Sequence, residues 1–184
     1  MKLQQPLKIA VTGRLRSGKD SVADILQEKT AFTVYRFADG ITDIIEHYFA
    51  DDLKIGKPRE HYQVIGQSLR QLDENVWVKA LHRKRQFGHL YCNELITDVR
   101  QPNEVKYCED HGFKIIKVVA DEEVRKQRAF HAGDNWEDSQ LQHPTELAVD
   151  CIVPDYQIHN NGTMDELVEK VNAVYQHILQ EEVE

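Results

Sequence analysis

Short apolar runs alternate along the chain with longer stretches in which apolar residues recur every three or four positions. Polar or turn-forming residues bound each run, as expected for the buried strands of a parallel sheet. "LKIAVTG" is the clearest of these runs, and "FKIIKVVA" is the next clearest. The pattern predicts strands over residues 7–13, 33–38, 92–99, 113–120 and 155–159.

The stretches between these runs have helical periodicity. In the first of them, Val22, Ile25 and Leu26 form one apolar face. In "QPNEVKYCEDHG", Pro102 lies in the expected first turn and Gly112 follows the expected end. Further helices are expected over about 40–50, 59–72 and 74–85, around Val124 and Arg128, near Glu146, and at the C-terminus.

Alternating strands and helices predict an α/β fold, a three-layer sandwich with a parallel five-stranded sheet and helices on both faces. Right-handed crossovers place the loops that follow the strands at one edge of this sheet. The sequence has no internal repeat, low-complexity linker or composition break, so residues 1–184 are expected to form one domain. We therefore look for the chemistry at the carboxyl ends of the strands.

Composition and charge narrow the function classes. A net charge of −8 argues against a general nucleic-acid binder, although it permits a locally positive cleft for small phosphorylated molecules. No apolar run approaches the roughly 20 residues that cross a bilayer, and "MKLQQPLK" lacks the apolar stretch of a secretory signal. Cys92, Cys108 and Cys151 lack metal-binding spacing and are expected to be reduced thiols. These features predict a cytoplasmic protein that binds neither nucleic acid nor membrane.

The segment "GRLRSGKDS" lies between the first strand and an amphipathic helix, which is the context of a phosphate-binding loop. Backbone N–H groups of such a loop surround phosphate oxygens, and the helix N-terminus adds positive charge. Lys19 would reach the outer phosphates. The candidate residues are Gly13, Arg14, Leu15, Arg16, Ser17, Gly18, Lys19, Asp20 and Ser21. The alternative is a glycine-rich turn with surface charges.

The residue after Lys19 departs from the common pattern, which has a serine or threonine there. Asp20 takes that place, and the hydroxyl comes one position later, at Ser21. A carboxylate is a good ligand for Mg²⁺, but without a cation it would repel a polyphosphate. We therefore expect the variant loop to be functional and to depend on a metal.

A second group of polar residues follows the third strand in "ITDVRQPNE". Asp98 and Arg100 would face the same crevice as the phosphate-binding loop, where Asp98 could hold magnesium and Arg100 could grip a phosphate. Glu104 could orient Arg100, or it could merely favour the first turn of the next helix. The alternative for Asp98 and Arg100 is a helix cap and a surface ion pair.

Two further regions could serve the second substrate. Arg70 and Trp77, in a helical region over about 39–88, would suit the phosphate and the base of a nucleotide, although a tryptophan is more often a core residue. The polar stretch after Arg125 and Arg128 has the length of a small lid, over about 129–146. An ordinary surface loop is the alternative there.

Taken together, these motifs resemble those of phage-type deoxynucleoside monophosphate kinases, a family of P-loop kinases. The segments that carry the resemblance are "GRLRSGKDSVAD", "RQLDENVWVKAL", "TDVRQPNE" followed by "HGFKIIKVV", and "IHNNGTMDEL". Animal-type phosphomevalonate kinases are similar in the S-G-K-D loop, and dephospho-CoA kinases are more distantly similar. Aspartate after the loop lysine belongs to the family pattern. "IGQSLRQL" and "HPTE" depart from it in the acceptor and lid regions, which leaves the base preference open.

The resemblance implies transfer of the γ-phosphate of ATP, with Mg²⁺, to a deoxynucleoside monophosphate. The implied catalytic residues are Lys19, Arg100 and Arg128, and the implied metal ligands are Asp20, Ser21 and Asp98. The implied acceptor residues are Arg36, Asp39, Arg70, Trp77 and Arg100. Asn161 and Gly162 would lie near the adenine, although Thr163 and Glu166 already explain that segment as a helix cap.

Three functions remain open at this point: a nucleoside monophosphate kinase, a kinase for another small phosphorylated acceptor, and a regulator that binds ATP without turnover. A phosphate-binding loop alone indicates binding and not catalysis. Arg70, Arg100, Arg125 and Arg128 favour catalysis. A homodimer is possible, as in other small kinases.

Overall fold

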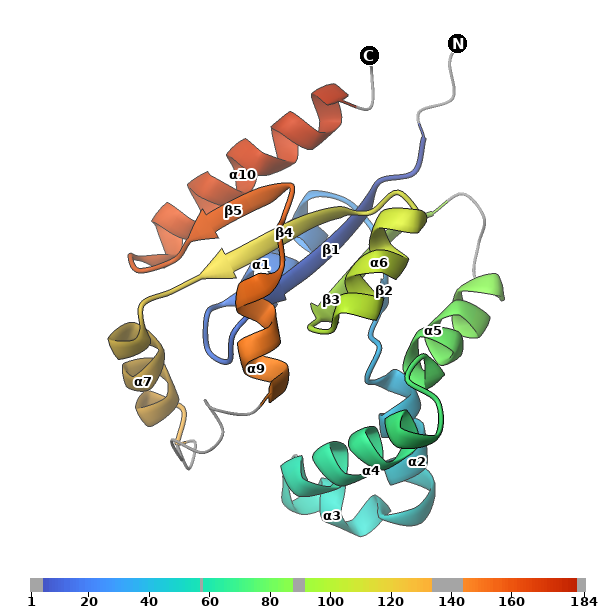
Figure 1. Cartoon of the computed structure of the whole chain (residues 1–184). Coiled ribbons are helices and arrows are strands. Elements are labelled where there is room, and N and C mark those ends of the chain that lie inside the picture. Colours follow the sequence, from blue (N-terminus) through green and yellow to red (C-terminus); the bar gives the residue numbers. More distant parts are fainter. Residues whose placement is uncertain (1–4, 57, 88–91, 134–143, 182–184) are drawn as a thin grey trace. The chain divides into compact units, whose positions relative to one another are not determined.

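A computed structural model describes residues 5–56, 58–87, 92–133 and 144–181. Its strands are β1 (Lys8–Gly13), β2 (Phe32–Tyr35), β3 (Asn93–Val99), β4 (Lys114–Val119) and β5 (Tyr156–His159). They form one sheet in the order β2-β3-β1-β4-β5, in which β1 pairs in parallel with β3 and β4, and β4 pairs in parallel with β5 (Figure 1). The predicted parallel five-stranded sheet is confirmed.

The described helices come close to the predicted positions. They are α1 (Lys19–Lys29), α2 (Asp39–Tyr48), α3 (Ala50–Ile55), α4 (Arg59–Leu72), α5 (Val76–Gln86), α6 (Pro102–Asp110), α7 (Glu122–His131), α9 (Pro144–Ala148) and α10 (Met164–Glu181), with a 3₁₀ turn η1 (Val149–Cys151). Two expectations were wrong in detail. The helix expected over 40–50 ends at Tyr48, and α3 follows it as a separate helix. The second strand ends at Tyr35 instead of residue 38, because the next residues turn into α2, where the Asp39 N–H donates to the Arg36 carbonyl.

The chain divides into two compact units, Met1–Val34 with Leu90–Glu184, and Tyr35–His89. The first contains the sheet and the phosphate-binding loop. The second contains α2 to α5 and nearly coincides with the region over 39–88 that the sequence assigned to the acceptor. That role of the second unit stays a prediction.

In the larger unit, helices cover both faces of the sheet (Figure 1). Helices α1 and α10 share one apolar core with the sheet, in which Ile9, Leu26 and Val171 have no exposed surface. Helix α6 lies on the other face (Figure 1). Burial of these aliphatic side chains holds β1 in the middle of the sheet, so the loop that follows β1 is flanked by the ends of β3 and β4.

In the smaller unit, α2, α4 and α5 pack around Ile41, Ile45, Trp77 and Leu81. Close approach of the helices depends on a small residue in α2: a Cβ on Gly40 would lie 3.1 Å from the ring of Trp77. Among the described helices, none combines the length and the apolar content that a bilayer crossing needs. Residues 134–143 of the predicted lid lie outside the described residues.

Candidate active site

The loop between β1 and α1 packs closely against its neighbours. A Cβ on Gly13 would lie 2.5 Å from Ser17 Oγ and 2.7 Å from the Val118 carbonyl oxygen. Gly18 has a left-handed backbone (φ 99°), and a Cβ there would lie 2.2 Å from Asn160 Nδ2. Arg16 also has positive φ, 61°. Positive φ is unfavourable for a residue with a side chain such as Arg16, and conformations of this kind concentrate at functional sites and need support from the surrounding structure.

Lys19 is the first residue of α1, and only 12% of its side chain is exposed. Its nearest described acidic partner is Asp20, with Oδ1 at 3.5 Å from Nζ, and Asp20 itself is largely exposed. Burial lowers the pKa of Lys19 below its ordinary value, and the charge of Arg100 acts in the same direction. Asp20 and Glu146 oppose this shift in the pKa. The Lys19 ammonium group is therefore partly desolvated, and an anionic ligand would stabilise its charge.

Arg100 follows the last residue of β3, and two glutamates hold it in place. Glu104 Oε2 accepts the backbone N–H of Arg100 at 2.8 Å and that of Gln101 at 3.0 Å, within a capping box at the start of α6. Glu146 Oε1 accepts a hydrogen bond from Arg100 Nη1. Glu104 therefore positions the backbone of Arg100, and Glu146 positions its side chain.

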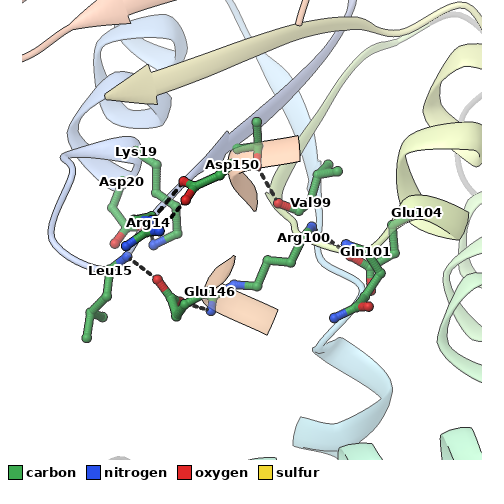
Figure 2. Close-up of polar contacts among 11 residues, drawn as sticks. Arg14, Leu15, Lys19, Asp20, Val99, Arg100, Gln101, Glu104, Glu146 and Asp150 are labelled. Carbon is green, nitrogen blue, oxygen red and sulfur yellow. Dashed lines mark hydrogen bonds and ion pairs between the residues drawn. The ribbon is translucent and has the colours of Figure 1, made fainter. Parts of the chain in front are cut away.

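Glu146 also contacts the phosphate-binding loop, which the sequence did not predict. Its Oε2 accepts the backbone N–H of Leu15 at 2.7 Å, and the residue is 4% exposed. Figure 2 shows its carboxylate between Leu15 and Arg100. Because 131 positions separate Glu146 from Leu15, no local spacing in the sequence could have indicated this contact.

A second carboxylate from the same segment pairs with the loop. Arg14 donates from Nε to Asp150 Oδ1 at 2.8 Å, and its Nη2 contacts Asp150 Oδ2 (Figure 2). This hydrogen bond raises the pKa of Arg14 and lowers the pKa of Asp150, so both groups stay charged at neutral pH. Lys117 Nζ fixes the same turn by donating to the carbonyl of Asp150 at 2.9 Å and to that of Ile152 at 3.1 Å.

Arg128 holds the other side of the loop. Its Nη1 donates to the carbonyl oxygens of Arg16 and Ser17, at 3.4 and 3.3 Å. Its Nη2 donates to the carbonyl oxygen of Asn160 at 3.0 Å and to Asn160 Oδ1 at 3.3 Å. Burial lowers the pKa of Arg128 from its ordinary value. The contacts described here make Arg128 a positioning residue for the loop, and its predicted catalytic role stays a prediction.

Asn160, which the sequence analysis missed, is the loop's main partner at the end of β5. It is 5% exposed, and its Nδ2 donates to the Ser17 carbonyl at 2.8 Å. The predicted Asn161 is exposed, and its Oδ1 accepts the backbone N–H of Asp121 at 2.8 Å, at the start of α7. The strand pattern could have indicated Asn160. In a strand the side chains alternate between the two faces, so residue 160 is expected on the same buried side as Ile158, opposite to exposed His159.

Arg125, in α7, is one of the four arginines that favoured catalysis in the sequence. Only 3% of it is exposed, and its Nε and Nη1 have no hydrogen-bond partner within the described parts of the chain. Burial, followed by the charge of Arg14, lowers the pKa of Arg125. A buried guanidinium group without such partners is costly unless an anion binds it.

The predicted metal ligands are hard oxygen donors around the start of α1 and on β3. Asp20 is exposed in the first turn of α1, Ser21 follows it, and Asp98 is half-buried in β3. No three His, Cys, Asp or Glu side chains of the described residues form a group that could hold a metal ion. Mg²⁺ usually takes one or two carboxylates together with phosphate oxygens and water. This donor set therefore fits Mg²⁺ in company with a polyphosphate.

Apart from Arg100, which follows β3 in the larger unit, the predicted acceptor residues lie in or beside the smaller unit's helices. Asp39 accepts Lys84 Nζ at 2.7 Å and the Arg36 backbone N–H at 3.3 Å. Arg70 is half-buried in the last turn of α4. Trp77 is 3% exposed, and its Nε1 donates to the Gly66 carbonyl at 3.1 Å. The burial of Trp77 favours packing, the alternative considered above, over stacking on a base.

Known proteins share this architecture. The family model described as deoxynucleotide monophosphate kinase matches residues 59–171, more than half of the chain. A dephospho-CoA kinase from Protochlamydia amoebophila (strain UWE25) is 25% identical over 203 residues, covering 93% of this chain and 96% of that protein.

Two solved structures have a similar fold. A gluconokinase from Sinorhizobium meliloti 1021 has a TM-score of 0.63 at 18% identity, with 97% of each chain covered. Shikimate kinase from Acinetobacter baumannii has a TM-score of 0.63 at 15% identity, with 98% of this chain and 97% of that chain covered. At these identities the likeness concerns the fold alone, and it confirms the predicted P-loop kinase architecture.

The tight packing of the loop predicts a specific stability cost. Gly18→Ala adds a methyl group where the backbone is left-handed and Asn160 is in the way, so it should destabilise the protein by more than the ~1–2 kcal/mol of left-handed strain alone. Gly112→Ala is the matched control, because Gly112 also has positive φ (73°) but open space around its Cβ. Thermal unfolding measures the difference, and equal losses would show that Asn160 does not restrict this position.

Proposed function

Because the chain belongs to the deoxynucleotide monophosphate kinase family, we propose that it transfers the γ-phosphate of ATP to the phosphate of a deoxynucleoside monophosphate, forming the diphosphate. In more general terms, the chain is a kinase with the P-loop fold. Membership of a kinase family implies that it uses ATP. The observation that carries the proposal is the meeting of Lys19, Arg100 and the phosphate-binding loop at the carboxyl edge of the sheet.

The donor phosphates are assigned to the loop from Gly13 to Ser21. Its backbone and the first turn of α1 offer N–H groups and the positive end of the helix dipole to phosphate oxygens. Lys19 would place its partly desolvated ammonium group on the outer phosphates. Asn160 and Arg128 hold the loop in shape from the other side, so the donor groups are positioned before the ligand arrives.

Magnesium is assigned to Asp20, Ser21 and Asp98. When bound, the ion supplies neutralisation of the charge on the donor phosphates. The exposed carboxylate of Asp20 would otherwise repel a polyphosphate.

Phosphoryl transfer asks the protein mainly for positioning and charge stabilisation. The phosphate of the acceptor is already ionised, so the reaction does not need a general base. Lys19 and Arg100 would stabilise the charge on the group in transfer, and the buried guanidinium of Arg125 is available to join them. Arg128 would contribute to the reaction indirectly, by holding the phosphate-binding loop in its conformation.

The acceptor is assigned to Arg36, Asp39 and Arg70 together with Arg100. The family match begins at residue 59 and so includes Arg70 and Arg100.

A second candidate function is phosphorylation of another phosphorylated small molecule, of the dephospho-CoA type. It is favoured by the 25% identity to the dephospho-CoA kinase over nearly the whole of both chains. A cytoplasmic location and a homodimer also stay proposals.

An acceptor panel tests the proposed function. ADP release from Mg-ATP is measured with each deoxy- and ribonucleoside monophosphate, with phosphomevalonate and with dephospho-CoA. We expect strong turnover with one or two deoxynucleotides, and a loss of about 10²- to 10³-fold in Lys19→Ala, as for removal of one preorganised donor. Lys106→Ala, which alters an exposed lysine on α6, is the control and should keep full activity. Turnover with dephospho-CoA alone would favour the second candidate, and near-full activity of Lys19→Ala would contradict the assignment of the loop.

The role of Asp20 predicts a change in the magnesium requirement. Asp20→Ala should raise the Mg²⁺ concentration that gives half-maximal activity several-fold, because one hard oxygen ligand is lost. Asp24→Ala, one turn further along α1 and also exposed, should leave the requirement unchanged. The measurement is a Mg²⁺ titration at fixed ATP, and identical titrations for Asp20→Ala and the unaltered protein would argue against a metal ligand at this position.

The lowered pKa of Lys19 predicts how ATP affinity depends on pH. Phosphates bind the protonated amine, so affinity should fall as pH rises through this pKa, starting below the range of an exposed lysine. Bound ATP should raise the pKa of Lys19 again. At a pH between the pKa of the free protein and that of the complex, ATP binding therefore takes up a proton. Calorimetry in two buffers of different ionisation enthalpy measures this uptake. Lys19→Arg keeps its charge and should lose both effects; an unchanged pH profile in that variant would assign the titration to another group.

A further inference from the structure

We propose that the Glu146 carboxylate is a built-in substitute for phosphate, which fills the phosphate site of the nucleotide-free protein and is displaced by the outer phosphate of ATP. This inference rests on the proposed function, since it takes ATP as the ligand. It assigns to α9 a part in nucleotide binding that the sequence motifs did not indicate.

The contacts of Glu146 are those expected of a bound phosphate. One carboxylate oxygen accepts the backbone N–H of Leu15, inside the phosphate-binding loop, at 2.7 Å. The other accepts Nη1 of Arg100, the arginine predicted to bind a phosphate (Figure 2). Loop N–H groups and arginine side chains are the donors that proteins use for phosphate oxygens, and carboxylates accept from the same donors.

The electrostatics of the site agree with this role. The charge of Glu146 raises the pKa of Arg14, Lys19 and Arg125, and for Lys19 and Arg125 it opposes the effect of burial. Glu146 is itself 4% exposed, so its charge is poorly screened by water. One buried carboxylate thus compensates several cations that would otherwise repel each other in the free protein.

Glu146 and a phosphate cannot use the site together. A phosphate oxygen that accepts the Leu15 N–H would occupy the place of Glu146 Oε2. Two anions forced into contact at a poorly screened site repel each other strongly. Binding of the outer phosphate therefore requires Glu146 to leave.

The segment around Glu146 is built so that this carboxylate can leave without detaching its neighbours. The turn η1 is anchored by the contacts of Asp150 with Arg14, by Lys117 on the carbonyls of Asp150 and Ile152, and by Val149, which is 1% exposed. Helix α9 itself is only five residues long, and its Leu147 is exposed. Release of Glu146 breaks its described contacts with Leu15 and Arg100 and leaves the anchors of η1 in place.

The test compares ATP binding by Glu146→Gln with that of the unaltered protein, using calorimetry with Mg-ATP and no acceptor. Glutamine has the same shape and can still accept the Leu15 N–H, but it has no charge. Because Glu146 fills the site in the free protein, its loss should tighten Mg-ATP binding by about tenfold, since the apparent Kd is the intrinsic Kd divided by the open fraction. Adenosine, which has no phosphate, should bind both proteins equally.

Glu122→Gln is the matched control. Like Glu146, Glu122 adds negative charge near the cations of the site, and it raises the pKa of both Arg14 and Arg125. Unlike Glu146, it is exposed, and its described ion pair is with Lys126. This variant should bind Mg-ATP as the unaltered protein does. Glu146→Ala, which removes the carboxylate altogether, repeats the test if the glutamine variant unfolds, and it should also bind more tightly.

Unchanged or weaker Mg-ATP binding by Glu146→Gln and Glu146→Ala would overturn the proposal and leave Glu146 as a support for the loop and for Arg100. Equal tightening by Glu122→Gln would overturn it as well, because the effect would then be one of net charge. The experiment involves no phosphoryl transfer. Tightened binding in a protein that phosphorylates none of the tested acceptors would therefore support this inference while the proposed function failed.

Discussion

The carbonyl groups of Arg16 and Ser17 point out of the phosphate-binding loop, and the site depends on their being satisfied. Arg128 and Asn160 supply the donors, and the amide of Asn160 leaves no room for a side chain at Gly18. A buried carbonyl such as that of Ser17 would destabilise the loop if it were left without a hydrogen bond. These hydrogen bonds join the β1 loop to α7 and to the end of β5. The same bonds therefore stabilise the fold of the larger unit and fix the shape of its site.

The second constraint is the concentration of positive charge beside the loop. Lys19 and Arg125 are both largely buried, and burial lowers the pKa of each. Such groups raise the energy of the empty site, and this cost is recovered when an anion binds. The acidic segment of α9 and η1 reduces the cost in the free protein through Glu146 and Asp150. Affinity for phosphate and stability of the free protein therefore oppose each other at this edge of the sheet.

The sequence predicted what depends on local pattern. Apolar runs located the sheet, and the position of Arg100 after a strand placed it at the correct edge. Glu146 could not be predicted, because its partners Leu15 and Arg100 are distant along the chain and their contact depends on the tertiary fold. For Trp77 the sequence allowed either a core position or a contact with the base of a nucleotide. It could not decide between them, because the sequence alone does not show whether neighbouring helices cover an aromatic ring. Asn160 could have been chosen over Asn161 by extending the alternation of β5.

Among the described contacts that hold the loop, those of Glu146, Arg128 and Asn160 reach its main chain, whereas Asp150 binds the side chain of Arg14. Glu146 binds the N–H of Leu15, while Arg128 binds the carbonyls of Arg16 and Ser17. The bond between Glu146 and residue 15 therefore does not depend on which side chain stands at that position. Mutational drift or deliberate engineering can therefore vary the side chain of Leu15 while this contact keeps the path of the loop. The loop is a place where new nucleotide preferences can evolve at little cost to folding.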